Sequence, residues 1–206
     1  MICRRSLSSE SNQKTKGIIM KLYKILAIFL ISIVITTIIN ARDNEIALSL
    51  MEASANGKTK IVKALIAGGA DVNAKTQFGS ALISASSMGH SEIVNILIDN
   101  GADVNIRNNK GLSSLMLARD TKTVRTLINR GADVNAKDNE GFTALIYASG
   151  LGYAEIVKIL IANGADVTAK TISTNPYFNG ITALKQAKRA NQKAVVKILK
   201  QAGAKE

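Results

Sequence analysis

A five-residue block, Gly-Ala-Asp-Val-Asn, recurs along the chain and constrains its fold more than any other feature. The block begins at Gly69, Gly101 and Gly131, returns with a final Thr at Gly164, and is reduced to Gly-Ala at Gly203. The steps between these glycines are 32, 30, 33 and 39 residues, close to the period of about 33 residues of one class of repeat protein. Such a chain stacks similar units, and each unit packs mainly against its neighbours.

Each period predicts two short helices. The residues before each Gly-Ala carry aliphatic pairs at helical spacing, as in Ile93-Val94 followed by Leu97-Ile98. A second apolar segment comes earlier in each unit and opens with Ser or Thr, as in Thr143-Ala-Leu-Ile, and such a hydroxyl is suited to cap a helix N-terminus. Each unit is therefore expected to form a turn, a helix, a turn and a second helix.

The segment from Asp138 to Thr168 resembles an ankyrin repeat, and the resemblance extends over about residues 45–206. The family's Thr-Pro-Leu-His motif appears as Thr143-Ala-Leu-Ile, so Ala144 replaces the proline. A first-turn proline is dispensable, because the amide that it lacks would be unpaired in any case. The resemblance implies an all-α ankyrin-repeat solenoid of about five helix-turn-helix units with short hairpin loops. It also implies a protein-binding scaffold, although a fold alone does not identify the partner.

The chain is expected to contain three segments. Residues 1–19 show no domain-like pattern and are a candidate mis-assigned extension, with Met20 as the alternative start. Residues 20–41 are expected to be a signal peptide or an N-terminal anchor. The ankyrin repeat domain is expected to cover residues 42–206, with units at approximately 45–75, 76–107, 108–137, 138–170 and 171–206.

An uncharged stretch from Ile25 to Ile39 follows Lys21 and Lys24. It is shorter than the roughly 20 residues that span a bilayer, but it suits the apolar core of a secretory signal. Cleavage is expected after Ala41; because that site is imperfect, an uncleaved anchor stays open. The lysines hold the N-terminal side in the cytoplasm, so the repeats are expected to be periplasmic or secreted, or else membrane-anchored outside the cytoplasm. The abundance of Ile, Lys and Asn is typical of a bacterium with an AT-rich genome.

Two units depart from the common pattern. The third unit is three residues short between Ala118 and Thr123, so we expect the stack to be weakest there. The fifth unit carries six extra residues before Gly180, which predicts a lengthened hairpin loop. We call residues 171–179 the finger.

The charge of the chain permits an anionic partner without identifying it. The net charge of the full chain is +12. Six basic residues and one acidic residue precede Ala41, so 21 basic and 14 acidic residues remain for the repeats, a net charge of +7. Nucleic acid is not an expected partner, because export would separate it from the chain and no basic stretch alternates with aromatic residues.

The residue types needed for catalysis or metal binding are scarce. Cys3 is the only cysteine and His90 the only histidine, which excludes a His-containing metal site and a Ser/His/Asp triad in practice. The recurring Asp103 and its counterparts occur once per unit, so they would not converge on one calcium ion. We therefore expect no catalytic residue, no metal and no cofactor, and the protein is not expected to be an enzyme.

In the ankyrin pattern, the hairpin tips and the residues that face the concave groove vary and bind partners. Carrying those positions over nominates the following partner-binding residues: Phe78, Met88, Lys110, Leu112, Phe142, Tyr147, Leu151, Tyr177, Phe178 and Arg189. Aromatic residues and Arg dominate binding hot spots. For Phe142, Tyr147 and the finger aromatics, packing against adjacent hairpins remains the alternative.

The sequence thus favours an exported protein–protein interaction module that binds another protein through its concave groove and hairpin tips. One alternative is a periplasmic inhibitor or immunity-like protein that blocks an enzyme by inserting the finger. A second alternative is an enzyme whose site the sequence does not reveal.

Overall fold

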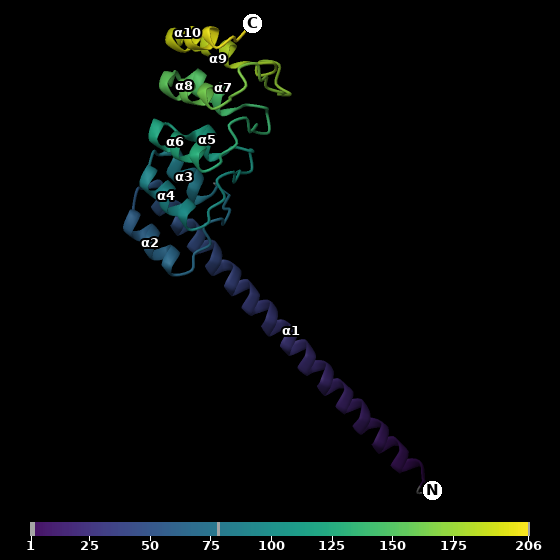
Figure 1. Cartoon of the computed structure of the whole chain (residues 1–206). Helices are drawn as coiled ribbons and strands as arrows, with labels where there is room; N and C mark the ends of the chain where they lie inside the picture. Colours follow the sequence, from purple (N-terminus) through teal and green to yellow (C-terminus); the bar gives the residue numbers. More distant parts are fainter. Residues whose placement is uncertain (1–2, 78, 206) are drawn as a thin grey trace. The chain divides into compact units, whose positions relative to one another are not determined.

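The structure, a computed structural model, describes residues 3–77 and 79–205. This part of the chain forms ten helices and no strand (Figure 1). The helices are α1 (Cys3–Ala55), α2 (Thr59–Ala67), α3 (Ala81–Ser87), α4 (Ser91–Asp99), α5 (Ser114–Leu117), α6 (Thr121–Asn129), α7 (Ala144–Leu151), α8 (Ala154–Ala162), α9 (Ala183–Arg189) and α10 (Lys193–Gln201). Contacts divide the chain into two units, residues 1–43 and 44–206.

Residues 44–206 form a solenoid of five helix pairs. The end of α1, from Asn44 onward, supplies the first helix, and the pairs that follow are α3 with α4, α5 with α6, α7 with α8, and α9 with α10. Successive odd-numbered helices from α3 to α9 contact one another, as do successive even-numbered helices. The loops between pairs lie on the side away from the even-numbered helices (Figure 1). The expected all-α solenoid is confirmed.

Hydroxyl caps start the first helix of each pair from α3 onward. Each capping oxygen accepts a hydrogen bond from the amide three residues later, which satisfies one of the otherwise unpaired N–H groups of the first turn. The caps are Ser80, Ser113, Thr143 and Thr182, and their bonds to Ile83, Met116, Ile146 and Lys185 measure 3.4, 3.4, 3.3 and 3.2 Å.

From α3 onward, one leucine from each helix of a pair fills the centre of the solenoid. These side chains are at most 3 % exposed and belong to one continuous cluster, so each unit is covered by its neighbours. They are Leu82, Leu115, Leu145 and Leu184 from the first helices and Leu97, Leu127, Leu160 and Leu199 from the second.

An asparagine ladder joins successive units, and it accounts for the last residue of the repeated block. The Asn105 Nδ2 atom donates to the Gly131 carbonyl at 3.1 Å, and its Oδ1 atom accepts from the Asp133 amide at 2.8 Å. Each rung therefore satisfies two backbone groups of the following unit. Asn73 and Asn135 make the same pair of bonds to their own following units.

The ladder stops at the fourth unit, where Thr168 replaces the asparagine. The Thr168 hydroxyl donates to the Asp166 carboxylate at 2.7 Å, and the Thr168 amide donates to the same oxygen at 2.8 Å. These bonds favour the charged form and hold the pKa of Asp166 below its usual value. Among the described residues, no pair of asparagine bonds of this kind therefore joins the fourth unit to the fifth.

The shortened third unit loses helix as well as turn. Helix α5 spans four residues, whereas α3 spans seven. Asp120 caps α6 with its side chain, accepting from the Thr123 amide at 2.8 Å. Within the described residues, three buried side-chain oxygens of the third unit, in Ser114, Asp120 and Thr123, lack a hydrogen-bond partner, against one in the fourth unit, in Ser149. Such unpaired buried groups are unfavourable.

We expect amide hydrogen exchange to be faster from Ala118 to Val124 than from Ala148 to Val157. The shorter first helix and the unpaired buried oxygens lower the free energy needed to open the third unit locally. Exchange measured by mass spectrometry on the same sample provides both values. Equal protection of the two segments would show that the shorter unit packs as well as the fourth.

Residues 3–43 all lie in α1. The large apolar side chains from Leu26 to Ile39 are each between 46 and 68 % exposed. They include consecutive residues, which point to different sides of a helix. In the part of the chain that the structure describes, no helix combines the length and apolarity that a membrane crossing requires.

Candidate partner-binding surface at the finger

The base and the turn of the finger are closed by hydrogen bonds. The Thr171 amide donates to the Ile181 carbonyl at 3.1 Å, and the Ile181 amide donates to the Thr171 hydroxyl oxygen at 2.9 Å. The same hydroxyl donates to the Phe178 carbonyl. At the turn, the Phe178 amide donates to the Asn175 carbonyl at 2.9 Å, and the Tyr177 amide donates to Asn175 Oδ1 at 3.0 Å. These bonds order the loop before any partner binds.

The finger also lies directly against the hairpin of the fourth unit. The Ile172 amide donates to the Glu140 carbonyl at 2.7 Å. Gly141 has a φ of +81°, and a Cβ atom at this position would lie 2.8 Å from the Ile172 nitrogen. The close approach of the two backbones therefore requires glycine here.

Four rings connect the finger to α7, and we call them the aromatic cluster (Phe142, Tyr147, Tyr177 and Phe178). The ring centroids of Tyr147 and Phe142 are 5.3 Å apart, those of Phe142 and Phe178 are 6.2 Å apart, and those of Phe178 and Tyr177 are 5.1 Å apart. Such distances are typical of favourable ring pairs. The finger thus folds back over the fourth unit.

Polar contacts fix both ends of the aromatic cluster. Tyr147 donates its hydroxyl hydrogen to Asp138 Oδ2 at 2.7 Å, and burial together with this bond raises the pKa of Tyr147 well above its usual value. At the other end, the Arg189 guanidinium carbon lies 4.6 Å from the Tyr177 ring centroid. Arg189 Nη1 also donates to the Tyr177 carbonyl at 2.9 Å. A cation over an aromatic face is attracted to it, so Arg189 holds Tyr177 in place.

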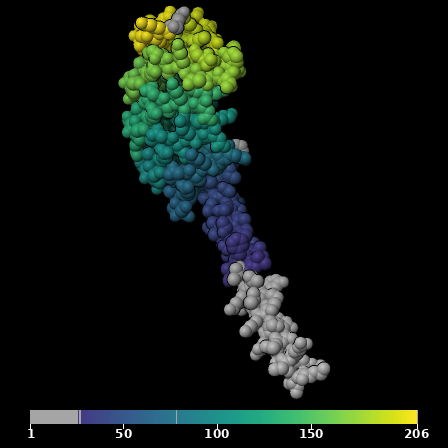
Figure 2. Space-filling view, turned by 90° about the vertical axis from the view of Figure 1, so that its right-hand side faces the viewer, coloured from purple at the N-terminus to yellow at the C-terminus, as the bar shows by residue number. Residues whose placement is uncertain are grey.

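The exposed side of this surface is apolar. Tyr177 is 63 % exposed and Phe178 is 36 % exposed, whereas Phe142 is only 8 % exposed. Phe142 therefore supports Phe178 from beneath and offers little of its own ring to a partner. In the space-filling view, residues after about 150 form one continuous surface at the end of the stack, coloured green to yellow (Figure 2).

The other nominated residues lie outside the aromatic cluster. Met88 and Leu151 are 61 and 55 % exposed at equivalent positions, eight residues after their capping hydroxyls. Lys110 is exposed in a hairpin, and Leu112 is partly buried against the core. Phe78 lies outside the described residues.

Sequence reasoning missed two residues of the surface. Ile172 is 73 % exposed within the finger, and an isolated aliphatic residue in the polar run Thr171-Ile-Ser-Thr was the available signal. Asp138 orients Tyr147. No local pattern in the sequence indicated that Asp138 would bond to Tyr147, because several polar residues of the hairpin could equally have reached a side chain of α7.

The described residues contain no group of three or more His, Cys, Asp and Glu side chains that could hold a metal ion. His90 Nε2 lies 3.0 Å from the Ala55 carbonyl oxygen of the preceding unit. This contact joins the His90 ring to the backbone of the preceding unit.

Two comparisons with known proteins bear on this arrangement. A family model described as ankyrin repeats (3 copies) matches residues 50–138 and residues 119–171. Together these matches cover more than half of the chain. No curated protein matches the chain significantly.

Proposed function

The chain belongs to the ankyrin-repeat family, whose repeats form protein–protein interaction modules, and on this premise we propose that it is an exported module whose partner binds the exposed side of the finger. The observation that carries the proposal is that Tyr177 and Phe178 are both ordered and exposed. Both rings are fixed by neighbours within the protein, and both still present apolar surface to solvent.

An ordered apolar surface favours binding for a physical reason. Association loses affinity when loops and side chains must be ordered in the complex. Here the hydrogen bonds of Asn175 and the position of Arg189 already restrict the finger. The surface also combines aromatic rings with an arginine, the residue types that dominate hot spots.

Recovery of the partner tests this proposal. The full chain is used to capture proteins from envelope extracts, in parallel with a Tyr177→Ala/Phe178→Ala variant of equal solubility. We expect one protein to be recovered with the unmodified chain and lost with the variant. Equal recovery with both chains would contradict a role for the finger.

The second candidate function is the inhibitor or immunity-like protein, and the closed base of the finger favours it. A loop held by Thr171 and Asn175 keeps its shape, as a loop that enters an enzyme cleft must do. Recovery of a stoichiometric hydrolase in the capture experiment would favour this candidate. Recovery of structural envelope proteins would favour a scaffold.

Export is the second part of the proposal. It is supported by the exposed apolar side chains from Leu26 to Ile39 and by the preceding Lys21 and Lys24, a combination typical of a secretory signal. An apolar stretch exposed on several sides of a helix is unfavourable in water. The same stretch would be stabilised by the apolar surroundings of an export pathway or a bilayer.

We expect protein isolated from its native host to begin close to Arg42, or to remain intact in the membrane fraction. Cleavage after Ala41 removes the charged and apolar residues of a signal, and an uncleaved segment keeps the chain attached. Mass spectrometry of the separated fractions measures the N-terminus and the location together. Intact protein in the soluble cytoplasmic fraction would contradict export.

A further inference from the structure

A cavity of about 380 Å³ lies beside α9 at the end of the solenoid. We call it the lysine cavity, and its lining residues are Lys170, Gly180, Thr182, Leu184, Lys185 and Lys188. Lys170 directly precedes the finger and Gly180 directly follows it. The cavity therefore adjoins the surface on which the proposed function rests.

The lysine cavity lies on the face of α9 that other units use for stacking. At the position of Lys185, the second and fourth units have Ile83 and Ile146, which are 4 and 1 % exposed. At the position of Lys188, the fourth unit has Ser149, which is fully buried. The fifth unit thus presents long cationic side chains where the others present small or aliphatic ones. The apolar stems of these lysines lie above Leu184, which is itself only 2 % exposed.

The charged residues among the described lining of the cavity are all basic. Every charged residue between positions 167 and 205 is basic, and no acidic residue is among the described residues that line the cavity. A concave site lined by one sign of charge concentrates groups of the opposite sign. Lysine ammonium groups act as compact point charges on flexible stems, and the stems can cover an apolar occupant.

We propose that the lysine cavity binds an acidic segment of the partner protein, with carboxylates near Lys170 and Lys185 and an apolar side chain against the lysine stems. This inference rests on the proposed function, since the same partner would contact the finger. A concavity of this volume admits individual side chains of a protein segment. The combination of apolar lysine stems and cationic ends favours a peptide over a uniformly charged polymer.

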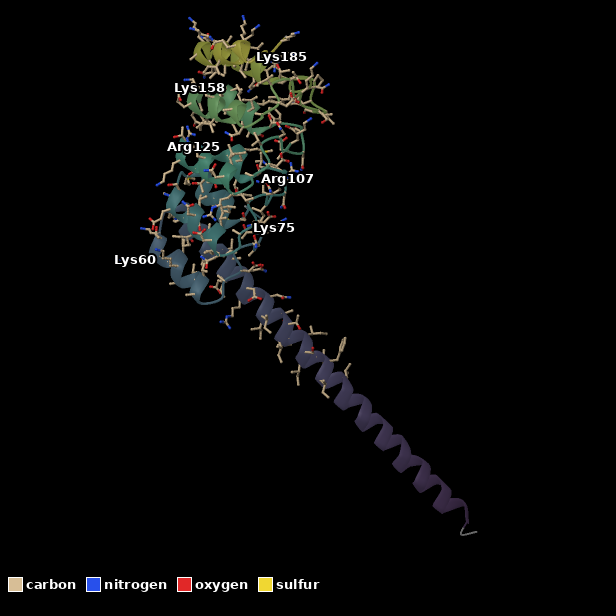
Figure 3. The ribbon with its side chains drawn as sticks, viewed as in Figure 1. Lys60, Lys75, Arg107, Arg125, Lys158 and Lys185 are labelled. Atoms are coloured by element: carbon tan, nitrogen blue, oxygen red, sulfur yellow. The ribbon has the colours of Figure 1, made fainter. Side chains whose placement is uncertain are left out.

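Lysines outside the cavity provide a matched control. Lys185 lies at the α9 end of the stack, whereas Lys60 lies at α2 in the first pair (Figure 3). Lys122 lies in α6 and is also exposed. A Lys60→Gln/Lys122→Gln variant therefore loses the same charge as Lys170→Gln/Lys185→Gln without altering the cavity.

The probe is a fluorescein-labelled heptapeptide with a central leucine flanked by glutamates, and its control peptide has glutamines in place of the glutamates. Fluorescence anisotropy with the full chain in mild detergent measures affinity at low and high salt. We expect the glutamate peptide to bind, and the Lys170→Gln/Lys185→Gln variant to bind about tenfold more weakly. The peptide affinity of the Lys60→Gln/Lys122→Gln variant should stay within about twofold of that of the unmodified chain, since salt screens charges that lie far from the cavity.

Several outcomes would overturn the inference. They are equal weakening by both lysine variants, equal binding of the glutamine peptide, and no binding of the glutamate peptide below about 1 mM. Loss of binding to phosphatidylglycerol vesicles in the cavity variant, with peptide binding unchanged, would assign the cavity to lipid and also overturn it.

A Tyr177→Ala/Phe178→Ala variant separates this inference from the proposed function. If that variant keeps its peptide affinity and still captures the cellular partner, the finger proposal fails and the cavity inference stands. If it loses the partner while the cavity variant retains both partner and peptide, the cavity inference fails and the finger proposal stands.

Discussion

Replacing Tyr177 and Phe178 together with alanine is expected to weaken partner binding by about 4 kcal/mol, at about 2 kcal/mol for each ring. The rings are 63 and 36 % exposed and are already ordered, so their burial by a partner needs little further loss of conformational freedom. Titration of the captured partner by calorimetry measures the change. It corresponds to roughly a thousandfold rise in Kd.

The same variant is expected to lose a smaller amount of stability. Phe178 contacts Phe142 at 6.2 Å between centroids, and such a ring pair contributes about 0.5–1.5 kcal/mol beyond its buried area. An Ile61→Ala variant is the control, because Ile61 is 51 % exposed on α2, remote from the finger in sequence. It should leave affinity unchanged. Lost stability with retained affinity in the finger variant would show that the rings only hold the last units together.

Gly141→Ala is expected to reduce the free energy of unfolding by about 2–5 kcal/mol. An alanine with positive φ costs about 1–2 kcal/mol, and the added Cβ would lie 2.8 Å from the Ile172 nitrogen. Overpacking of this kind costs about 1–3 kcal/mol more. Because the clash is with backbone, the finger must move as a whole. Denaturant unfolding monitored by circular dichroism measures the effect.

Gly164→Ala is the matched control for this prediction. Gly164 has a similar φ of +85°, but a Cβ atom there would have no heavy atom within 4 Å among those described. Its substitution should therefore cost only the conformational part, about 1–2 kcal/mol. Equal losses in the two variants would mean that the finger does not press against Gly141 in solution.

The period of the repeated block predicted the fold well, because stacking depends on features that recur within each unit. The capping role of Thr143 was visible locally, and the structure confirms its bond to Ile146. The shortening of α5 was only partly visible. The missing residues between Ala118 and Thr123 indicated a short turn. In the structure α5 is also shortened, to four residues, and Asp120 caps α6.

The asparagine ladder was missed because its partners lie 26 to 31 residues apart in the sequence. An asparagine after Asp-Val is also typical of an ordinary loop. Its bonds to the next unit depend on the stacking distance, which no single unit determines.

The sequence predicted where the candidate surface lies along the chain, but it did not predict how its side chains pack. The insertion between Lys170 and Gly180 marked the finger, since the repeat pattern does not require it. Its direction depends on contacts with the previous hairpin, above all the bond from Ile172 to Glu140. Those contacts also decide that Phe142 is covered while Tyr177 is exposed.

The asparagine ladder also favours some positions over others for duplication of a unit. A second copy of the unit that contains Asn105 would offer its Gly and Asp backbone groups to the preceding asparagine and reach the next unit with its own. Both new junctions would then be complete, since each unit contacts only its neighbours. A unit inserted after Thr168 would instead meet a hydroxyl already bonded to Asp166. Duplication of interior units would therefore lengthen the protein while the finger and the lysine cavity stay together at one end.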